Sequence, residues 1–528
     1  MYKLLDRNLF LEAILGSLVL SAIAFSIQSS YGFSWSDEGL LWYASQRTYL
    51  GELAIRDFFA YDPGRYYWNS IFFLIFSDTG LNTLLIAASS FGAFGLAITW
   101  YTMGMAKVNV KWRFCFAILI TIALGYPRHK VYEQSLSLIL VAVLFMVLTN
   151  SSSSRRWFVF GLATGVAAIF GRNHGVFFVG SAVLCGGYLL ATKRANILPR
   201  VIVWYLLGVG LGYLPVISLF IFDSGFREAF WQSILFTGNW QLPLPIPFFW
   251  TIDYSAPLTY KFIHSLAIGF TCIVIPAIYF TGLLFFVSRD VFSREERSPA
   301  FYLLGASSIA GIPYLHQAFN RADFGHIAQA TVPVFVAIAA IYLLQSKKNR
   351  NQIIIHIILF VSLVILLCAW IPSQPILRSI RMEILHPGAT KYFSIYGKNF
   401  VIRKSQSTLL DQVKKIAEHC EISDGQFLAA PHFPGIYAYL GLKAPFWEMY
   451  YLYQRSPEFQ KKHVDAISDV RLILLAAGAT VDGLERLRLK NTYGVLLDHI
   501  LNNYRKLNVS GLPKGVALYV DPRSCDVN

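Results

Sequence analysis

Charged residues are scarce in this sequence of 528 residues. Asp, Glu, Lys and Arg make up only 14% of the chain, whereas soluble proteins carry roughly 25%. Cysteine is also scarce, with six residues and no Cys-x-x-Cys pair. This scarcity excludes a disulfide-stapled scaffold, and it makes zinc modules and thioredoxin-like redox chemistry poor interpretations.

Hydrophobic residues are abundant instead, at 55% of the chain, and they include 42 Phe, 29 Tyr and 12 Trp. The net charge of +15 could suggest nucleic-acid binding. A protein with many membrane spans, however, also collects Lys and Arg on its cytoplasmic side. The composition therefore predicts an integral membrane protein, and we expect no nucleic-acid partner.

A transmembrane helix needs about 17–25 mostly apolar residues. Eleven segments are apolar enough to be candidate spans, and those between residues 112 and 191 are the shortest. They are Phe10–Gln28, Leu81–Met103, Trp112–Tyr126, Val131–Leu148, Trp157–Phe170, Val176–Ala191, Val201–Phe222, Phe262–Val287, Ala300–Leu315, Ile327–Leu344 and Ile353–Ile371. The sequence thus predicts a mainly α-helical polytopic protein of about eleven transmembrane helices.

The loops between these spans differ in charge. With the N-terminus placed inside, the inner loops hold more Lys and Arg than the longer outer loops. This excess predicts a cytoplasmic N-terminus and, after eleven spans, an extracytoplasmic C-terminal region. In a bacterium, the protein would lie in the inner membrane with that region in the periplasm.

The tail after the last span is richer in charged residues than the rest of the chain. Leu409–His419 and Thr492–Tyr504 have helical patterns, whereas Gln426–Ala430 and Arg471–Leu475 resemble buried strands. We therefore expect a transmembrane domain over residues 1–371 and a small extracytoplasmic α/β domain over residues 372–528. A bond between Cys420 and Cys525 is possible in an oxidising compartment.

Acidic residues gather in the first outer loop, residues 29–80. Asp37 and Glu38 come at the start of a predicted helix, and adjacent helical residues do not face each other. They are therefore poor candidates for the opposed acid pair of a glycoside hydrolase, but one could act alone as a base while its neighbour orients it. Alternatively, Ser34-x-x-Asp37 is a capping box, and the acids only stabilise the helix start.

This loop resembles that of a known family. The stretch SDEGLLWYASQRTYLGELAIRDFFAYDPGRYYW combines an Asp-Glu pair, an Asp-Phe-Phe and a Pro-Gly-x-Tyr-Tyr between two spans. It is similar to the first loop of GT-C superfamily membrane glycosyltransferases, in the bacterial branch of protein O-mannosyltransferase-like and aminoarabinose-transferase-like enzymes. The layout of eleven spans and an outer C-terminal domain agrees with a GT-C-like fold.

The resemblance implies transfer of a sugar from a polyprenyl-phosphate carrier to a hydroxyl of a glycan, lipid or protein on the outer face, in cell envelope glycan synthesis. Asp37 matches the family's general base, and Glu38 would orient it or hold the acceptor. A single displacement would invert the anomeric centre. No cofactor is required on this evidence, although a divalent cation is possible. Predicted contacts with the acceptor or sugar are Asp57, Asp62, Arg65 and Tyr66.

A lipid phosphate leaving group needs cations or hydrogen-bond donors near its developing charge. Three outer-side clusters offer them. The predicted donor-phosphate ligands are Arg128 and Lys130 in YPRHK, Arg172 and His174 in GRNHG, and Arg321 and His326 in NRADFGH. Each has a plainer alternative: basic side chains at span ends often extend to lipid headgroups, and Arg321 could simply pair with Asp323. Asp323 and His326 are too few ligands to define a metal site.

Two other classes of membrane protein remain open. A transporter or flippase of lipid-linked saccharides would also need cations and aromatic side chains, but it would place them near the membrane midplane. His356 and Glu12 are almost the only ionisable residues inside predicted spans, which favours the enzyme. An O-antigen ligase or polymerase usually relies on a large late loop and lacks an early Asp-Glu pair. The sequence does not give the sugar, the acceptor or the oligomeric state.

Overall fold

A computed structural model describes residues 6–239, 242–255, 257, 259–292, 297–344 and 350–523. Within them the chain is mainly helical and divides into two compact units. The first unit comprises residues 1–29, 85–227 and 241–377, and the second comprises residues 30–84, 228–240 and 378–528. Cys525, one partner of the possible disulfide, lies outside the described residues.

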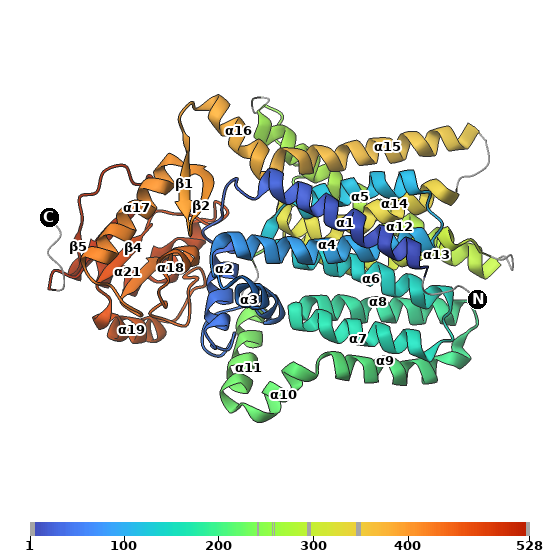
Figure 1. The fold of residues 1–528 in the computed structure, drawn as a ribbon, viewed down its shortest axis with the longest axis horizontal. Coiled ribbons are helices and arrows are strands. Elements are labelled where there is room, and N and C mark those ends of the chain that lie inside the picture. Colours follow the sequence, from blue (N-terminus) through green and yellow to red (C-terminus); the bar gives the residue numbers. More distant parts are fainter. Residues whose placement is uncertain are drawn as a thin grey trace. The chain divides into compact units, whose positions relative to one another are not determined.

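Long apolar helices make up the first unit and run alongside one another (Figure 1). They are α1 (Arg7–Gln28), α4 (Leu81–Met105), α5 (Val110–Leu124), η1 (Arg128–Lys130), α6 (Val131–Thr149), α7 (Ser154–Phe170), α8 (Arg172–Ala191), η2 (Ala195–Ile197), α9 (Leu198–Gly212), α10 (Leu214–Phe222), α12 (Tyr260–Phe292), α13 (Pro299–Asn320), α14 (Phe324–Leu344), α15 (Arg350–Trp370) and η3 (Ile371–Ser373). The first residues of α4 belong to the second unit.

All eleven predicted apolar segments are helical, which confirms the mainly helical membrane fold. Within the described residues, seven helices are long and apolar enough to cross a membrane, namely α1, α4, α6 with η1, α8, α12, α14 and α15 with η3. The segment Val201–Phe222 is divided into α9 and α10, which meet at a bend of 61° and would together form an eighth span. The helices α5 and α7 have only 15 and 17 residues. Eleven crossings therefore remain a prediction.

Small residues allow two of these helices to pack closely. Gly161 and Gly165 of α7 face Gly208 and Gly212 of α9, so each helix carries a Gly-x-x-x-Gly pair. A Cβ atom on Gly161 would lie 2.0 Å from the carbonyl oxygen of Tyr205, so no side chain fits there. Small-residue pairs of this kind hold membrane helices together through close backbone contact.

The second unit joins the loop between α1 and α4 to the tail. Its helices are α2 (Asp37–Tyr49), α3 (Gly64–Phe76), α11 (Ser224–Asn239), α16 (Pro375–Leu385), α17 (Lys404–His419), α18 (Pro434–Leu440), α19 (Pro457–Ala466), η4 (Ile467–Asp469), η5 (Glu485–Leu487), α20 (Leu489–Thr492) and α21 (Gly494–Asn503). The first residues of α11 and α16 belong to the first unit. The predicted tail helices correspond to α17 and α21.

Two small sheets complete the tail. Strands β1 (Thr390–Ile395) and β2 (Lys398–Arg403) form an antiparallel pair. The second sheet has the order β3-β4-β6-β5, with β3 (Phe427–Ala430), β4 (Leu472–Leu475), β5 (Arg505–Lys506) and β6 (Ala517–Val520). Strands β3 and β4 are parallel and wholly buried, as their apolar sequences predict. The tail is therefore a small α/β structure, although the proposed domain boundary after residue 371 stays a prediction.

The helix α2 packs against α18 of the tail so tightly that only glycine fits at the contact. A Cβ atom on Gly39 would lie 2.5 Å from the backbone nitrogen of Gly435. Farther along α2, the amide of Gln46 donates to the carbonyl oxygen of Ala438 at 3.2 Å, and the backbone N–H of Ala444 donates to the Tyr43 hydroxyl at 3.0 Å. The loop between α1 and α4 and the tail are thus one packed unit.

Candidate active site

The two acids at the start of α2 have different surroundings. The side-chain oxygen Oε2 of Glu38 accepts a hydrogen bond from the backbone N–H of Ser34 at 2.9 Å, and Glu38 is only 5% exposed. The Ser34 hydroxyl in turn accepts from the backbone N–H of Asp37 at 3.3 Å. This reciprocal pair of bonds resembles a capping box, but its acid is Glu38, four residues after Ser34, and the N-cap residue of α2 is Ser36. The structural explanation predicted for this motif therefore accounts for Glu38, but not for the Asp37 carboxylate.

Asp37 is exposed at the start of α2, and its carboxylate accepts no hydrogen bond from the described residues. It interacts electrostatically with the tyrosines Tyr61 and Tyr450 and with His432. Burial, reinforced by the negative charge of Asp37, raises the pKa of Tyr450 well above its ordinary value. Tyr450 therefore stays protonated, and its hydroxyl donates to the carbonyl oxygen of Ser36 at 3.0 Å.

His432 belongs to the tail and directly follows Pro431 at the end of strand β3. Its ring packs edge-on against Tyr450, with centroids 6.2 Å apart. Its buried Nδ1 atom has no hydrogen-bond partner among the described residues. Burial lowers the pKa of His432, while the charges of Asp37 and Asp482 act in the opposite direction. A neutral imidazole with a free ring nitrogen therefore lies in the electrostatic neighbourhood of Asp37.

The other predicted loop residues are mostly occupied or buried. The Asp57 carboxylate pairs with Arg56 at 2.7 Å and accepts from the backbone N–H of Leu53, and the hydrogen bond from Arg56 lowers its pKa. Asp62 and Arg65 are both 8% exposed, and Arg65 lies over the Tyr61 ring. Tyr66 is 1% exposed, and its hydroxyl accepts from the backbone N–H of Tyr61. Their contacts with an acceptor or sugar stay predictions.

The first unit brings two of the three predicted cation clusters together. Tyr126, just before η1, stacks on Phe324 at the start of α14, with ring centroids 5.6 Å apart. Lys130 of the first cluster interacts electrostatically with His326 of the third. The Lys130 ammonium also lies 3.5 Å from the Glu133 carboxylate. We call Arg128, Lys130, Arg321 and His326 the basic cluster.

Asp323 organises one side of the basic cluster. Its carboxylate accepts from the backbone N–H of His326 at 3.0 Å, contacts the His326 ring at 2.8 Å and pairs with Arg321. Burial alone would raise the pKa of Asp323, but His326 and Arg321 together hold it well below its ordinary value. Arg321 also donates to the carbonyl oxygen of Leu242 at 3.2 Å. The pairing predicted as the plainer alternative for Arg321 and Asp323 is therefore present.

The second cluster lies close by but is more buried. Phe170, which precedes it, stacks on Tyr132 of α6 with centroids 6.1 Å apart. His174 is 3% exposed, and its Nδ1 atom shares a hydrogen bond of 2.8 Å with the Tyr314 hydroxyl. Arg172 is half-buried. Contact of Arg172 and His174 with a donor phosphate stays a prediction.

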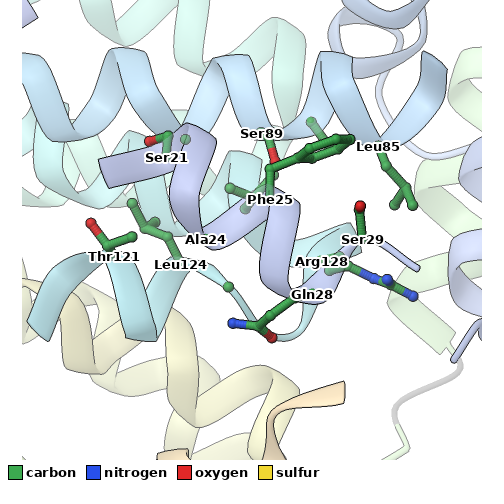
Figure 2. Close-up of a pocket in the computed structure, with 14 residues that line it drawn as sticks. Ser21, Ala24, Phe25, Gln28, Ser29, Leu85, Ser89, Thr121, Leu124 and Arg128 are labelled. Atoms are coloured by element: carbon green, nitrogen blue, oxygen red, sulfur yellow. The ribbon is translucent and has the colours of Figure 1, made fainter. Parts of the chain in front are cut away.

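Arg128 also lines a small cavity of about 60 Å³ in the first unit. Figure 2 shows Arg128 near Ser29 at one end of this pocket and Ser21 and Thr121 towards the other. Phe25 and Leu124 lie between them. The cavity is too small for a sugar. Within the described residues, no group of three or more His, Cys, Asp or Glu side chains could hold a metal ion.

Comparisons with known proteins give no match to any family model and no significant match among curated sequences. Solved structures do match. ArnT from Cupriavidus metallidurans bound to undecaprenyl phosphate aligns with a TM-score of 0.56 and 12% identity, over 98% of this chain and 99% of that one. The chain has the GT-C fold. The seven or eight candidate spans in the described part of the chain, together with this fold, identify an integral membrane protein.

Two further structures with the GT-C fold align less closely. ArnT from Cupriavidus metallidurans in the apo state has a TM-score of 0.49 and 12% identity, over 98% of this chain and 99% of that one. The Archaeoglobus fulgidus oligosaccharyltransferase, tethered to an acceptor peptide containing the NVT sequon, has a TM-score of 0.48 and 12% identity, over 99% of this chain and 75% of that one.

Sequence patterns do not predict the part of the candidate site that the tail contributes. His432 and Tyr450 lie about 400 residues after Asp37 along the chain, a separation that pattern reading does not bridge. One signal was present. In open sheets, ligands bind beyond the carboxyl ends of parallel strands, and His432 follows β3 at such an end. In this GT-C-fold chain the candidate site thus combines the loop between α1 and α4 with the tail.

Proposed function

We propose that this protein is a membrane glycosyltransferase that moves a sugar from a polyprenyl-phosphate donor to a hydroxyl acceptor on the outer face of the membrane. The observation that carries the proposal is the exposed Asp37 carboxylate, which stands apart from the capping box that occupies Glu38. The GT-C fold, shared with a protein whose structure contains undecaprenyl phosphate, supports the lipid-linked donor. We place the N-terminus in the cytoplasm and the tail in the periplasm of a bacterial inner membrane.

In the proposed reaction, an acceptor hydroxyl attacks the anomeric carbon of the donor sugar and transfers its proton to Asp37. The bond between the anomeric carbon and the phosphate oxygen breaks as the new glycosidic bond forms, and polyprenyl phosphate leaves with the electron pair. Asp37 acts as general base, while Glu38 holds the start of α2 through Ser34. Because one displacement occurs, the anomeric configuration inverts.

We assign the donor phosphate to the basic cluster. Cations directed at a leaving phosphate stabilise its developing charge in the transition state. The charge of Lys130 acts on His326. Asp323 binds both Arg321 and His326 and so holds their side chains in place. Arg172 and His174 would act nearby.

The proposal is tested by reconstituting the purified protein in vesicles with polyprenyl-phosphate-linked sugars and candidate hydroxyl acceptors. We expect glycosylated acceptor and free polyprenyl phosphate in equal amounts, as measured by mass spectrometry. If the intact donor instead crosses the bilayer with no glycosylated product, the protein is a flippase and the proposal is wrong. Donors with hexosyl and pentosyl groups, supplied in parallel, would identify the sugar class.

Replacement of Arg128 by Gln is expected to raise the KM for the lipid-linked donor about tenfold to a hundredfold. A hydrogen bond to a charged group contributes about 1.5–3 kcal/mol, which corresponds to that range. Steady-state kinetics with varied donor would measure the effect. The matched control is Lys111→Gln, an exposed cation at the start of α5, and an equal change in both variants would contradict the assignment.

Replacement of His432 by Leu is expected to lower kcat/KM for the acceptor about tenfold, because one neutral hydrogen bond contributes about 0.5–1.5 kcal/mol. His432→Asn, which keeps a polar atom near Nδ1, should retain more activity. Since burial lowers its pKa, His432 stays neutral at pH 7 and becomes charged only below its ordinary pKa of about 6.5. Wild-type activity should therefore fall at acidic pH below that value.

The activity of His432→Asn should fall less at acidic pH than that of the wild type, because asparagine does not become charged there. Exposed His419 at the end of α17 provides the control, and His419→Asn should keep the wild-type pH profile. Superimposable profiles for the wild type and His432→Asn would exclude a role of His432 at the site. Asp37 would remain testable on its own, since its replacement acts on the rate of transfer.

A further inference from the structure

A second, larger cavity lies in the first unit, away from the basic cluster. It has a volume of about 450 Å³ and lies among the helices α1, α4, α6 and α7. Apolar side chains form nearly all of its lining, including Phe10, Ile14, Phe94, Ile98 and Met146. Phe10 and Phe94 are 45% and 50% exposed, so the cavity opens on the apolar outer surface of these helices. In a membrane, such an opening faces lipid chains.

One cation lines this cavity. Arg156 is in the first turn of α7, and its Nη1 atom donates to the carbonyl oxygen of Met146 at 2.5 Å and to the Thr149 hydroxyl at 2.8 Å. These two bonds fix the guanidinium against the last turn of α6. No carboxylate among the described residues pairs with Arg156, and neither Nε nor Nη2 has a hydrogen-bond partner there. Arg156 therefore retains donors for an anion.

A second arginine of the first unit, Arg113, does not share this property. Arg113 of α5 pairs with Glu12 of α1 at 3.1 Å, and Glu12 also accepts from the indole N–H of Trp100 at 3.0 Å. That ion pair is complete within the protein. In the described part of the chain, by contrast, no acidic side chain neutralises the positive charge of Arg156. The cavity beside Arg156 is apolar.

The length of α6 separates Arg156 from the basic cluster. Lys130 directly precedes α6, whereas Arg156 binds Met146 and Thr149 at its other end. A helix of 19 residues is about 28 Å long at about 1.5 Å per residue, which is close to the roughly 30 Å thickness of the hydrocarbon core. One lipid phosphate cannot reach both ends. The cavity thus belongs to the leaflet opposite the proposed donor phosphate.

We propose that this cavity binds an anionic phospholipid, with an acyl chain between α1, α4, α6 and α7 and the phosphate on Arg156. The apolar lining fits a hydrocarbon chain, and Arg156 offers charge-assisted hydrogen bonds that a phosphate accepts. The ligand is a diacyl lipid of the inner leaflet rather than the polyprenyl donor, because the donor phosphate is assigned to the far end of α6. This choice of ligand rests on the proposed function, whereas the apolar lining and the hydrogen bonds of Arg156 do not depend on it.

The test titrates the delipidated full-length protein in detergent with phosphatidylglycerol or phosphatidylcholine and counts bound lipids by native mass spectrometry. We expect the wild type to bind one phosphatidylglycerol about tenfold more tightly than phosphatidylcholine, as one charge-assisted hydrogen bond allows. Arg156→Gln should remove this preference. Arg156→Lys should keep part of it, and Arg155→Gln, a change at the exposed neighbour, should leave it intact.

A second variant tests the acyl-chain site. Ala97 lines the cavity, and Ala97→Phe should fill part of it and weaken binding of both lipids about equally. Equal affinity of the wild type for the two lipids would overturn the proposal, as would an equal loss of preference in Arg156→Gln and Arg155→Gln. Tighter binding of polyprenyl phosphate than of phosphatidylglycerol, abolished by Arg156→Gln, would also overturn it. A transfer assay on Arg156→Gln separates this outcome from failure of the proposed enzyme activity.

Discussion

Replacement of Asp37 by Asn is expected to lower the rate of sugar transfer by about 10²–10⁴-fold, the usual contribution of a general base. The amide has nearly the same size as the carboxylate but cannot take a proton from the acceptor. Because the Asp37 carboxylate makes no hydrogen bond to the described residues, the change should leave the fold of α2 intact. Single-turnover transfer with saturating donor and acceptor would measure the loss.

Two neighbouring acids provide controls for Asp37→Asn. Asp57→Asn alters an acid of the same loop that already pairs with Arg56, so a much smaller loss of rate is expected. Glu38→Gln should weaken the capping box and lower thermal stability along with activity, since Glu38 holds the backbone of Ser34. If Asp37→Asn transferred sugar at the wild-type rate while remaining folded, Asp37 would not be the base.

The buried ion pair between Glu448 and Arg455 should contribute strongly to the stability of the second unit. Replacement of Arg455 by Met is expected to destabilise the second unit by about 3–5 kcal/mol, the cost of leaving a buried charge without its partner. Glu448 is 1% exposed, and its Oε2 atom accepts from Arg455 at 2.9 Å and from the Tyr493 hydroxyl at 2.7 Å. Without Arg455, the Glu448 carboxylate would remain in an apolar core formed by residues such as Tyr451.

The pH dependence of this loss has a definite sign. Burial raises the pKa of Glu448 in the folded protein, although Arg455 and Tyr493 partly oppose the shift. Removing Arg455 takes away the positive charge that lowers the pKa of Glu448, so this pKa in the folded protein should rise further above the unfolded value of about 4.3. Protonation then relieves the buried charge, and the deficit of Arg455→Met should shrink as the pH falls towards that value.

Urea unfolding of the full chain in detergent, at two pH values, would measure both effects. The double variant Glu448→Gln/Arg455→Met should recover much of the loss, because it removes the buried charge. Arg523→Met is the matched control, since Arg523 pairs with Asp521 at the surface and has an 81% exposed side chain. Little change is expected there. A deficit in Arg455→Met that is no larger than in Arg523→Met would contradict the buried-charge explanation.

Much of the fold could be predicted because a long apolar run indicates a membrane helix without any knowledge of long-range contacts. Leu81–Met103 and Phe10–Gln28 match α4 and α1 closely, and the tail pattern gave β3 and β4 within one residue. The bend between α9 and α10 was not predicted, although Pro215 follows it directly. Hydropathy alone indicates a continuous apolar run and does not show whether the helix axis bends within it.

The candidate site was predicted only in part because its residues come from distant segments. The Asp-Glu pair was visible, but the sequence did not show which acid closes the capping box, since the reach of a side chain depends on the local backbone. In the structure Glu38 makes this bond. The fit of Gly39 against Gly435 and the position of His432 depend on packing between the loop and the tail. Hydrophobic periodicity within one segment does not predict packing between distant segments.

The most direct measurement is the configuration of the transferred sugar. The purified protein in vesicles would receive a polyprenyl-phosphate sugar of known anomeric configuration and a hydroxyl acceptor, and the product linkage would be determined by nuclear magnetic resonance. We expect transfer with inversion in the wild type and almost none with Asp37→Asn. Retention of configuration, or movement of the intact donor across the bilayer without transfer, would contradict single displacement with Asp37 as the base.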